Sequence, residues 1–131
     1  MMTGAVTSRL EAVLNVHVLG PDGRSETLPA VIDTGFSGFI TLPPELIAQM
    51  GLTFAGPDRF VLADGNEALF RAFGVTVVWN GQPRRVLAHE ANTDALIGMA
   101  LLHGSRLTMD IVENGPLRRS PVNDCPRSSH L

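Results

Sequence analysis

Apolar and polar residues alternate along residues 10–19, where the pattern predicts a strand with one buried face. The apolar positions on that face are Ala12, Leu14, Val16 and Val18. The segment Gly20-Pro21-Asp22-Gly23 follows, and it combines a proline suited to the second position of a turn with glycines that can close the turn. We therefore predict a hairpin whose second strand runs over residues 24–28.

Two more hairpins are predicted further along the chain. In the first, strands over 60–63 and 67–70 flank the turn Asp64-Gly65-Asn66. In the second, strands over 74–79 and 83–89 flank Asn80-Gly81, a dipeptide that is typical of two-residue hairpin turns. Both segments indicate antiparallel β-structure.

Shorter elements complete the pattern. Buried strands are predicted over 30–33, 39–42 and 95–98, a helical turn over 99–102, and a last strand over 106–112. A helix begins at Pro43-Pro44-Glu45, runs to Met50 and stops at Gly51, with Leu46, Ile47 and Met50 on its core-packing side. Because turns recur at short intervals and helices are few, we expect an all-β fold with a closed or folded sheet and one or two short helices.

Composition and charge narrow the class of protein. The chain has 131 residues, 44% of them hydrophobic, which suits a single globular domain with a substantial core. Its 10 basic residues are all arginine, its formal net charge is −3, and no basic run appears in its body. We therefore do not expect a nucleic-acid partner.

The cysteine content and the two ends of the chain indicate its cellular context. Cys125 is the single cysteine, so no disulfide can form within the chain. Residues 1–10 lack the apolar run of a signal peptide, and no stretch reaches the roughly 18 apolar residues of a membrane span. We expect a soluble, cytoplasmic protein with no membrane partner. From Pro116 onward Pro, Arg, Ser and Asn dominate, which predicts a flexible tail over 116–131 behind one domain over 1–115.

The turn Asp33-Thr34-Gly35 carries the candidate chemistry. It follows the apolar run Ala30-Val31-Ile32, so the acid is expected at the tip of a sharp turn that leaves a buried strand. Gly35, as a glycine, is free to adopt a positive φ in that turn. Asp-Thr-Gly is also an ordinary turn sequence, in which the aspartate caps its own backbone. A catalytic Asp33 and a purely structural one both remain open at this point.

Three segments together resemble the retropepsin-like aspartic proteases, and more closely the small single-domain proteases of this type in bacteria. They are residues 31–38 with the Asp-Thr-Gly-Phe-Ser-Gly motif, Ala63-Asp64-Gly65, and Ala95-Leu96-Ile97-Gly98. The resemblance implies a closed acid-protease β-barrel with one lobe per chain. It also implies a role for each matching residue: Asp33 is catalytic, Thr34, Gly35 and Gly98 support the active-site loop, and Ala63, Asp64 and Gly65 form a flap over the substrate.

One carboxylate is half of such a site. Two adjacent carboxylates can share one proton, so that one deprotonates water and the other protonates the leaving amide, with no metal or cofactor. Because the chain has one Asp-Thr-Gly triplet, the resemblance implies a homodimer in which the two copies of Asp33 meet and hydrolyse a peptide or protein substrate. The alternative is the same fold used as a non-catalytic dimerisation or peptide-binding module.

The chain departs from the viral members of the family where their dimers are braced. Phe36-Ser37-Gly38 and Gly98-Met99-Ala100 stand in place of the charged residues found there, and residues 116–120 are a poor strand. His89-Glu90 lacks the spacing of a metal-binding pair, so we expect no metal. His17 and His103 are expected to lie on a strand surface and at a helix end.

Overall fold

The computed structural model describes residues 2–61 and 64–122, and there the chain is mainly β, as the sequence predicts. The strands are β1 (Met2–Val6), β2 (Ala12–Leu19), β3 (Ser25–Ile32), β4 (Ile40–Leu42), β5 (Thr53–Val61), β6 (Glu67–Trp79), β7 (Gln82–Glu90), β8 (Leu96–Ile97), β9 (Ser105–Met109) and β10 (Pro116–Pro121). The helices are α1 (Pro44–Met50), α2 (Met99–Leu102) and the short 3-10 turn η1 (Pro21–Gly23).

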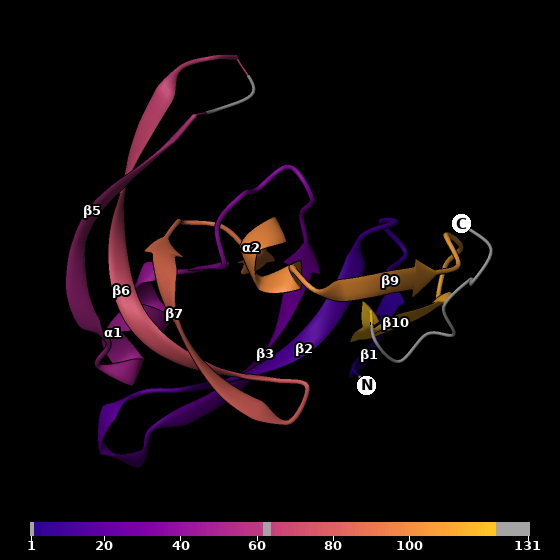
Figure 1. Ribbon diagram of the computed structural model, residues 1–131, viewed down its shortest axis with the longest axis horizontal. Helices are drawn as coiled ribbons and strands as arrows, with labels where there is room; N and C mark the ends of the chain where they lie inside the picture. Colours follow the sequence, from indigo (N-terminus) through magenta and orange to yellow (C-terminus); the bar gives the residue numbers. More distant parts are fainter. Residues whose placement is uncertain (1, 62–63, 123–131) are drawn as a thin grey trace.

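The strands form one sheet that closes on itself. Their order is β5-β6-β7-β4-β8-β3-β2-β1-β10-β9, and β6 also pairs with β2. That extra pairing joins the run from β6 to β2 into a ring. Figure 1 shows the ring, the β5–β6 hairpin that projects above it, and the β1, β10 and β9 strands on the side away from the hairpin.

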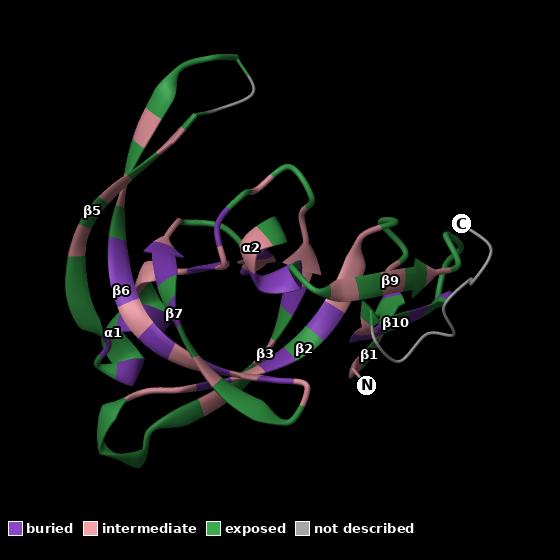
Figure 2. Cartoon of the chain, viewed as in Figure 1, coloured by how far each residue is buried: buried purple, intermediate pink, exposed green. Residues whose placement is uncertain are grey.

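Apolar side chains fill the ring. Alternate residues of β2 point inward, and Leu14, Val16 and Val18 have no exposed surface. Figure 2 shows the same alternation of buried and less buried positions along β6. Ile97 of β8 and Leu101 of α2 are also fully buried, so apolar contacts hold the short central elements in place. Each such side chain contributes about 1.5–3 kcal/mol through its burial.

The turns behave as their sequences predict. Asn80 and Gly81 join β6 to β7 with positive φ angles of 54° and 76°. Gly51 ends α1 with a left-handed φ of 64°, a conformation that favours glycine at the end of a helix. The predicted helix and its end at Gly51 are confirmed, and so is the Asn80-Gly81 turn. The apolar helix residues Leu46, Ile47 and Met50 are buried.

Three strands are longer than the sequence predicts. β3 runs without a break from Ser25 to Ile32, and β6 joins the segments 67–70 and 74–79 into one strand of 13 residues. The two ends of β6 differ in partner, since β5 pairs with residues 67–74 and β7 with residues 72–79. The first part of β5, which the sequence left unassigned, is a strand because β6 pairs with it through Thr53.

The prediction of a flexible tail from residue 116 is wrong for residues 116–121, which form β10. This strand lies between β1 and β9 and pairs with both. Its inward positions are Leu117, which is buried, and Arg119, whose guanidinium lies 5.3 Å from the Trp79 ring centroid. Arg119 therefore takes a place that the pattern expects an apolar residue to fill, because its stem and its stacking on an aromatic ring allow burial. Cys125 lies outside the described residues.

The first strand, β1, was not predicted. Its three middle residues, Thr3, Gly4 and Ala5, are small or polar, and Gly4 is needed because a Cβ there would lie 2.0 Å from the carbonyl oxygen of Val13 on β2. In the described ranges, no helix is long and apolar enough to cross a membrane.

Candidate active site

Asp33 directly follows β3 and lies at the end of the ring. β8 runs parallel to β3, with Val31 opposite Leu96 and Ile32 opposite Ile97, and β4 lies on the other side of β8. The backbone N–H of Asp33 donates to the carbonyl of Ile97 at 2.9 Å. The Asp33 turn therefore starts from a fixed point in the sheet.

Gly98 lies directly beneath the loop that follows Asp33. Its N–H donates to the carbonyl of Phe39 at 3.0 Å, and the N–H of Met99 donates to the carbonyl of Phe36 at 2.8 Å. A Cβ on Gly98 would lie 2.2 Å from the carbonyl oxygen of Gly38 and 2.6 Å from the Phe36 ring. The structure thus brings the two predicted segments together, and only glycine fits at their contact.

The Asp33 carboxylate is partly exposed, and one of its oxygens is held by the turn itself. The Gly35 N–H donates to Oδ1 at 2.9 Å, while Oδ2 has no partner among the described residues. Gly35 does not use its freedom to adopt a positive φ. Glycine suits this position because there is little room for a side chain: a Cβ would lie 3.2 Å from Asp33 Oδ1. Thr34 beside it is exposed.

A pocket of about 280 Å³ opens beside Asp33. Its described lining is Asp33, Gly35, Phe36, Ser37, Thr41, Phe60, Val61, Phe70, His89, Ala91, Thr93 and Leu96. Asp33 is the one carboxylate in that set, and most of the other side chains are apolar. The pocket therefore has one acid, one histidine and an aromatic wall.

The β5–β6 hairpin contributes to this pocket through its stem. Phe60 and Phe70 point inward from the two strands, with ring centroids 5.8 Å apart, and Phe60 meets Phe36 of the Asp33 loop at 5.3 Å. The predicted flap-tip residues Asp64 and Gly65 are exposed and do not line the pocket, and Ala63 lies outside the described residues.

The tip has a turn geometry of its own. Gly65 has a φ of 85°, and the Asn66 N–H and side-chain amide both donate to the Asp64 carboxylate, at 2.9 and 3.0 Å. These two hydrogen bonds hold the pKa of Asp64 below its ordinary value. They are bonds between neighbours in the chain, so they shape the tip without attaching it to the ring.

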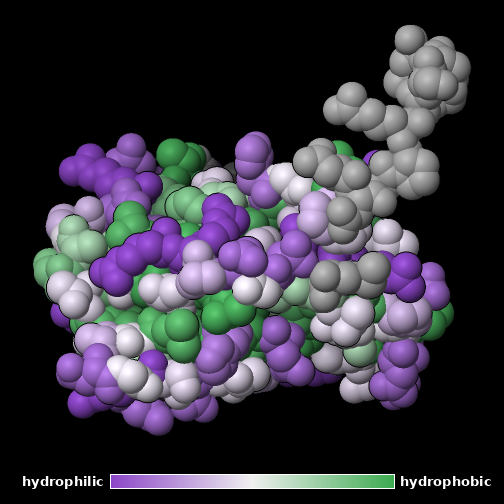
Figure 3. Space-filling view, turned by 60° about the horizontal axis from the view of Figure 1, so that its bottom comes forward, coloured by the Kyte–Doolittle hydropathy of each residue, from purple (hydrophilic) through white to green (hydrophobic). Residues whose placement is uncertain are grey.

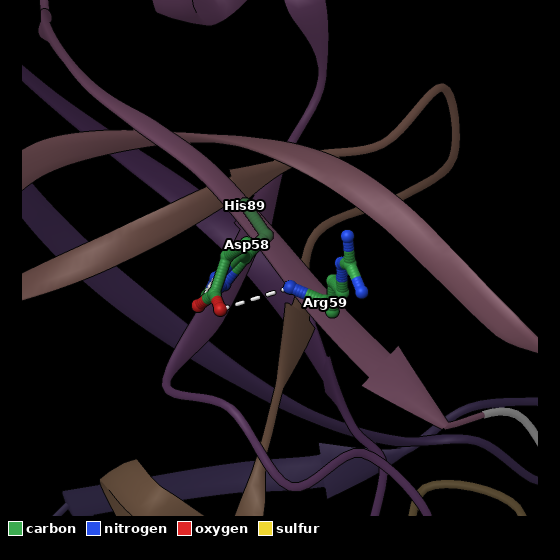
Figure 4. Close-up of polar contacts among 3 residues, drawn as sticks. All are labelled: Asp58, Arg59 and His89. Atoms are coloured by element: carbon green, nitrogen blue, oxygen red, sulfur yellow. Dashed lines mark hydrogen bonds and ion pairs between the residues drawn. The ribbon is translucent and has the colours of Figure 1, made fainter.

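Sequence reasoning missed His89 and Asp58 as members of the site. His89 on β7 is 2% exposed, and its Nε2 lies 2.9 Å from Oδ2 of Asp58 on β5 (Figure 4). The hydrogen bond from His89 is the main cause that lowers the pKa of Asp58, and the backbone N–H of Arg59 adds to it. The chain carried one weak signal, a histidine directly after the apolar run Val86-Leu87-Ala88, but its partner lies 31 residues away in the chain.

Other polar candidates stay apart from the pocket. His17 is half-buried on β2, with its Nδ1 2.9 Å from the Thr27 hydroxyl on β3. His103 is an exposed residue that follows α2, as predicted. Within the described ranges, no three His, Cys, Asp or Glu residues gather in a way that could hold a metal ion. On the face seen in Figure 3, hydrophobic groups appear in several separate areas between hydrophilic ones.

Comparisons with known proteins agree with this architecture. No protein-family model and no curated protein matches the sequence. Among solved structures, the chain is similar to a retropepsin-like aspartic protease from Rickettsia conorii, with a TM-score of 0.52 and 17% sequence identity. The match covers 90% of this chain and 88% of that one. With the closed ring of strands and the Asp33 loop seated on Gly98, this likeness establishes that the chain has a retropepsin-like fold.

Proposed function

We propose that the protein is an aspartic endopeptidase that works as a homodimer. The observation that carries the proposal is the setting of Asp33 at the edge of a mainly apolar pocket. Its carboxylate is partly exposed, and one of its oxygens has no partner among the described residues. A lone carboxylate cannot act as base and acid at once, so a second copy of the chain supplies the other Asp33. In this arrangement Thr34 and Gly98 support the two loops at the two-fold axis.

The reaction needs one proton shared between the two carboxylates. The ionised Asp33 takes a proton from water, and the hydroxide oxygen bonds to the carbonyl carbon of the peptide. The protonated Asp33 donates to that carbonyl oxygen as the tetrahedral intermediate forms. As the intermediate collapses, one of its two hydroxyls returns its proton to the ionised Asp33 and the C=O bond re-forms. The C–N bond breaks at the same time, and the amine leaves with the proton of the other Asp33. One water is consumed, and the two carboxylates again hold one shared proton.

The proposed substrate is an extended peptide or protein segment. Phe36, Phe60 and Phe70 form an apolar wall that suits an apolar substrate side chain. The β5–β6 hairpin, with Asp64 and Gly65 at its tip, then acts as a flap over the bound segment. A cytoplasmic location belongs to the proposal too, supported by the single cysteine of the chain.

A non-catalytic binding module is the second candidate, and two observations favour it. Asp33 Oδ1 already accepts the Gly35 N–H, as an aspartate does when it caps its own turn. The terminal strands β1 and β10 pair with each other inside one chain, so neither is free to interlock with a second copy. Under this reading the pocket binds a peptide without cleaving it.

Replacement of Asp33 by Asn separates the two candidates. As an enzyme, the protein is expected to lose about 10²–10⁴-fold in peptide cleavage in the Asp33→Asn variant, because the variant cannot act as base. Asp22→Asn, in the exposed η1 turn, is the matched control and should cleave like the wild type. Adding Asp33→Asn protein in excess to the wild type should also lower cleavage, since mixed dimers carry one carboxylate. Unchanged cleavage by Asp33→Asn would rule out the proposed enzyme.

A further inference from the structure

His89 is a buried polar side chain that the proposed chemistry does not use. It is 2% exposed, and its Nδ1 has no hydrogen-bond partner among the described residues. Among the described residues, its one polar contact is from Nε2 to Asp58 Oδ2, at 2.9 Å. Because an ionised carboxylate only accepts hydrogen bonds, Nε2 carries the proton that joins the two residues.

The contact links two strands that are not neighbours in the sheet. In the strand order, β6 lies between β5, which carries Asp58, and β7, which carries His89. Ala72 of β6 is opposite His89 on one side and Gly56 on the other. Since Ala72 and Gly56 have almost no side chain, Asp58 can reach across β6 to His89 on the inner face of the hairpin.

β5 has few other attachments to the body of the protein. It is the terminal strand of the sheet, so its described backbone pairing is with β6 alone. The register shifts between Phe54 and Gly56, which places an irregularity at the base of the hairpin. The His89–Asp58 contact (Figure 4) lies just beyond this irregularity along β5.

An aromatic cluster extends the same contact toward Asp33. The Phe60 ring meets the His89 ring edge to face, with centroids 4.6 Å apart, and Phe36 and Phe70 lie within 6.5 Å of it. Phe36 belongs to the Asp33 loop, whereas Phe60 and Phe70 belong to the hairpin. His89 is therefore the residue at which the hairpin, the ring and the Asp33 loop meet.

The other ion pairs of the hairpin differ in their surroundings. Arg59 and Glu67 lie 3.5 Å apart with side chains 74% and 60% exposed, and Arg71 lies 3.5 Å from Glu90 with its own side chain 62% exposed. Exposed pairs of this kind contribute little to positioning. In the His89–Asp58 pair, the His89 side chain is 3% exposed and the Asp58 side chain is 45% exposed, so the histidine end of the hydrogen bond is shielded from solvent.

We propose that His89 is a positioning residue for the candidate active site. By binding Asp58 and packing against Phe60, it keeps the inner face of the β5–β6 hairpin close to Asp33. At that distance the pocket can enclose a substrate side chain. This role in substrate binding rests on the proposed function, but the hold on the hairpin itself does not. Loss of the pair frees the hairpin and weakens substrate binding more than turnover.

Hydrogen exchange tests the hold on the hairpin without any substrate. In Asp58→Ala and His89→Leu we expect the amides of β5 and the first half of β6 to exchange about tenfold faster or more, with the amides of β2 and β3 unchanged. His89→Gln, which keeps an N–H donor, should restore much of the protection. Glu67→Gln is the matched control, because it removes an ion pair from the outer face of the same hairpin. Wild-type exchange in the β5–β6 hairpin of Asp58→Ala would overturn the proposal.

Peptide binding tests the link to the active site. With Asp33→Asn as the background, a fluorescent peptide that the wild type cleaves should bind about tenfold more weakly when Asp58→Ala is added. In the catalytic background, KM should rise by a similar factor while kcat stays within about twofold. Unchanged KM with faster hairpin exchange would overturn the role in binding. If the wild type neither cleaves nor binds any peptide, the proposed function fails, while the exchange result still decides the hold on the hairpin.

Discussion

At the scale of single residues, Gly98 shows how closely the Asp33 loop is seated. Its N–H and the N–H groups of Met99 and Ala100 donate to three carbonyls of the loop, at 2.8 to 3.1 Å. There is no room between the two segments for a side chain of any size. The position of Asp33 therefore depends on Gly98 having no Cβ.

Gly98→Ala is expected to lower the free energy of unfolding by about 1–3 kcal/mol, because the added methyl group forces the loop away from α2. Peptide cleavage should fall more than stability alone explains, since Asp33 moves with the loop. Urea unfolding and cleavage rates measure the two effects. Ala100→Gly, in the same helix, is a control that leaves the loop in place; wild-type cleavage by Gly98→Ala would contradict the predicted displacement.

Asp58 gives stability a defined dependence on pH. Its pKa is lowered in the folded protein, so the ionised form stabilises the fold above the ordinary aspartate pKa of about 4. The advantage of the wild type over Asp58→Asn should be lost as the pH falls from about 4 through the lowered pKa of Asp58. Urea titrations of both proteins at several pH values measure it. An advantage that grows as the pH falls would contradict the sign of this linkage.

At the scale of elements, β10 is the strand that differs most from what the sequence predicts, since its residues were expected to form a flexible tail. It lies between β1 and β9 and carries the buried Leu117 into the same core as β2. Its neighbours are one strand from the start of the chain and one from its second half. β10 therefore belongs to the folded domain, and the last element of the fold extends past residue 115.

Leu117→Ala is expected to cost about 2–5 kcal/mol of stability, the usual range for removing a buried leucine side chain. Arg118→Ala, on the exposed face of the same strand, should change stability by less than about 0.5 kcal/mol. Chemical denaturation of both variants checks this difference. Equal and small effects would mean that β10 is not packed as described.

At the scale of the whole molecule, folding and the proposed chemistry have different requirements. The ring closes and the core fills within one chain, and the terminal strands β1 and β10 pair within that chain. One copy therefore completes its own fold. It supplies one Asp33, however, so the proposed reaction needs two copies.

Stability and cleavage are accordingly expected to respond differently to dilution. The Tm should be nearly independent of protein concentration, because no second copy is needed to form the core. Cleavage per mole of protein should fall once the concentration drops below the dissociation constant of the dimer. Scanning calorimetry and cleavage assays over a wide concentration range check this. A Tm that rises strongly with concentration would mean that the fold itself is shared between copies.

Local sequence was sufficient for the elements whose cause is local. Alternation along β2 predicts its buried face, Asn80-Gly81 predicts the tight hairpin, and Gly51 predicts the end of α1, since each depends on residues adjacent in the chain. The contact between the Asp33 loop and Gly98 is not local, and it was implied only by the resemblance of the two motifs to a known family; the two segments do lie in hydrogen-bond contact.

Tertiary contacts decided what local pattern leaves open. Arg119 is buried because its guanidinium stacks on the Trp79 ring, and β10 forms because β1 and β9 pair with it on its two sides. Asp58 meets His89 because Gly56 and Ala72 leave room between them, and no property of either residue alone indicates that contact. Burial and hydrogen bonding depend on partners distant in the chain, so these features follow from how the strands assemble rather than from the order of residues within any one of them.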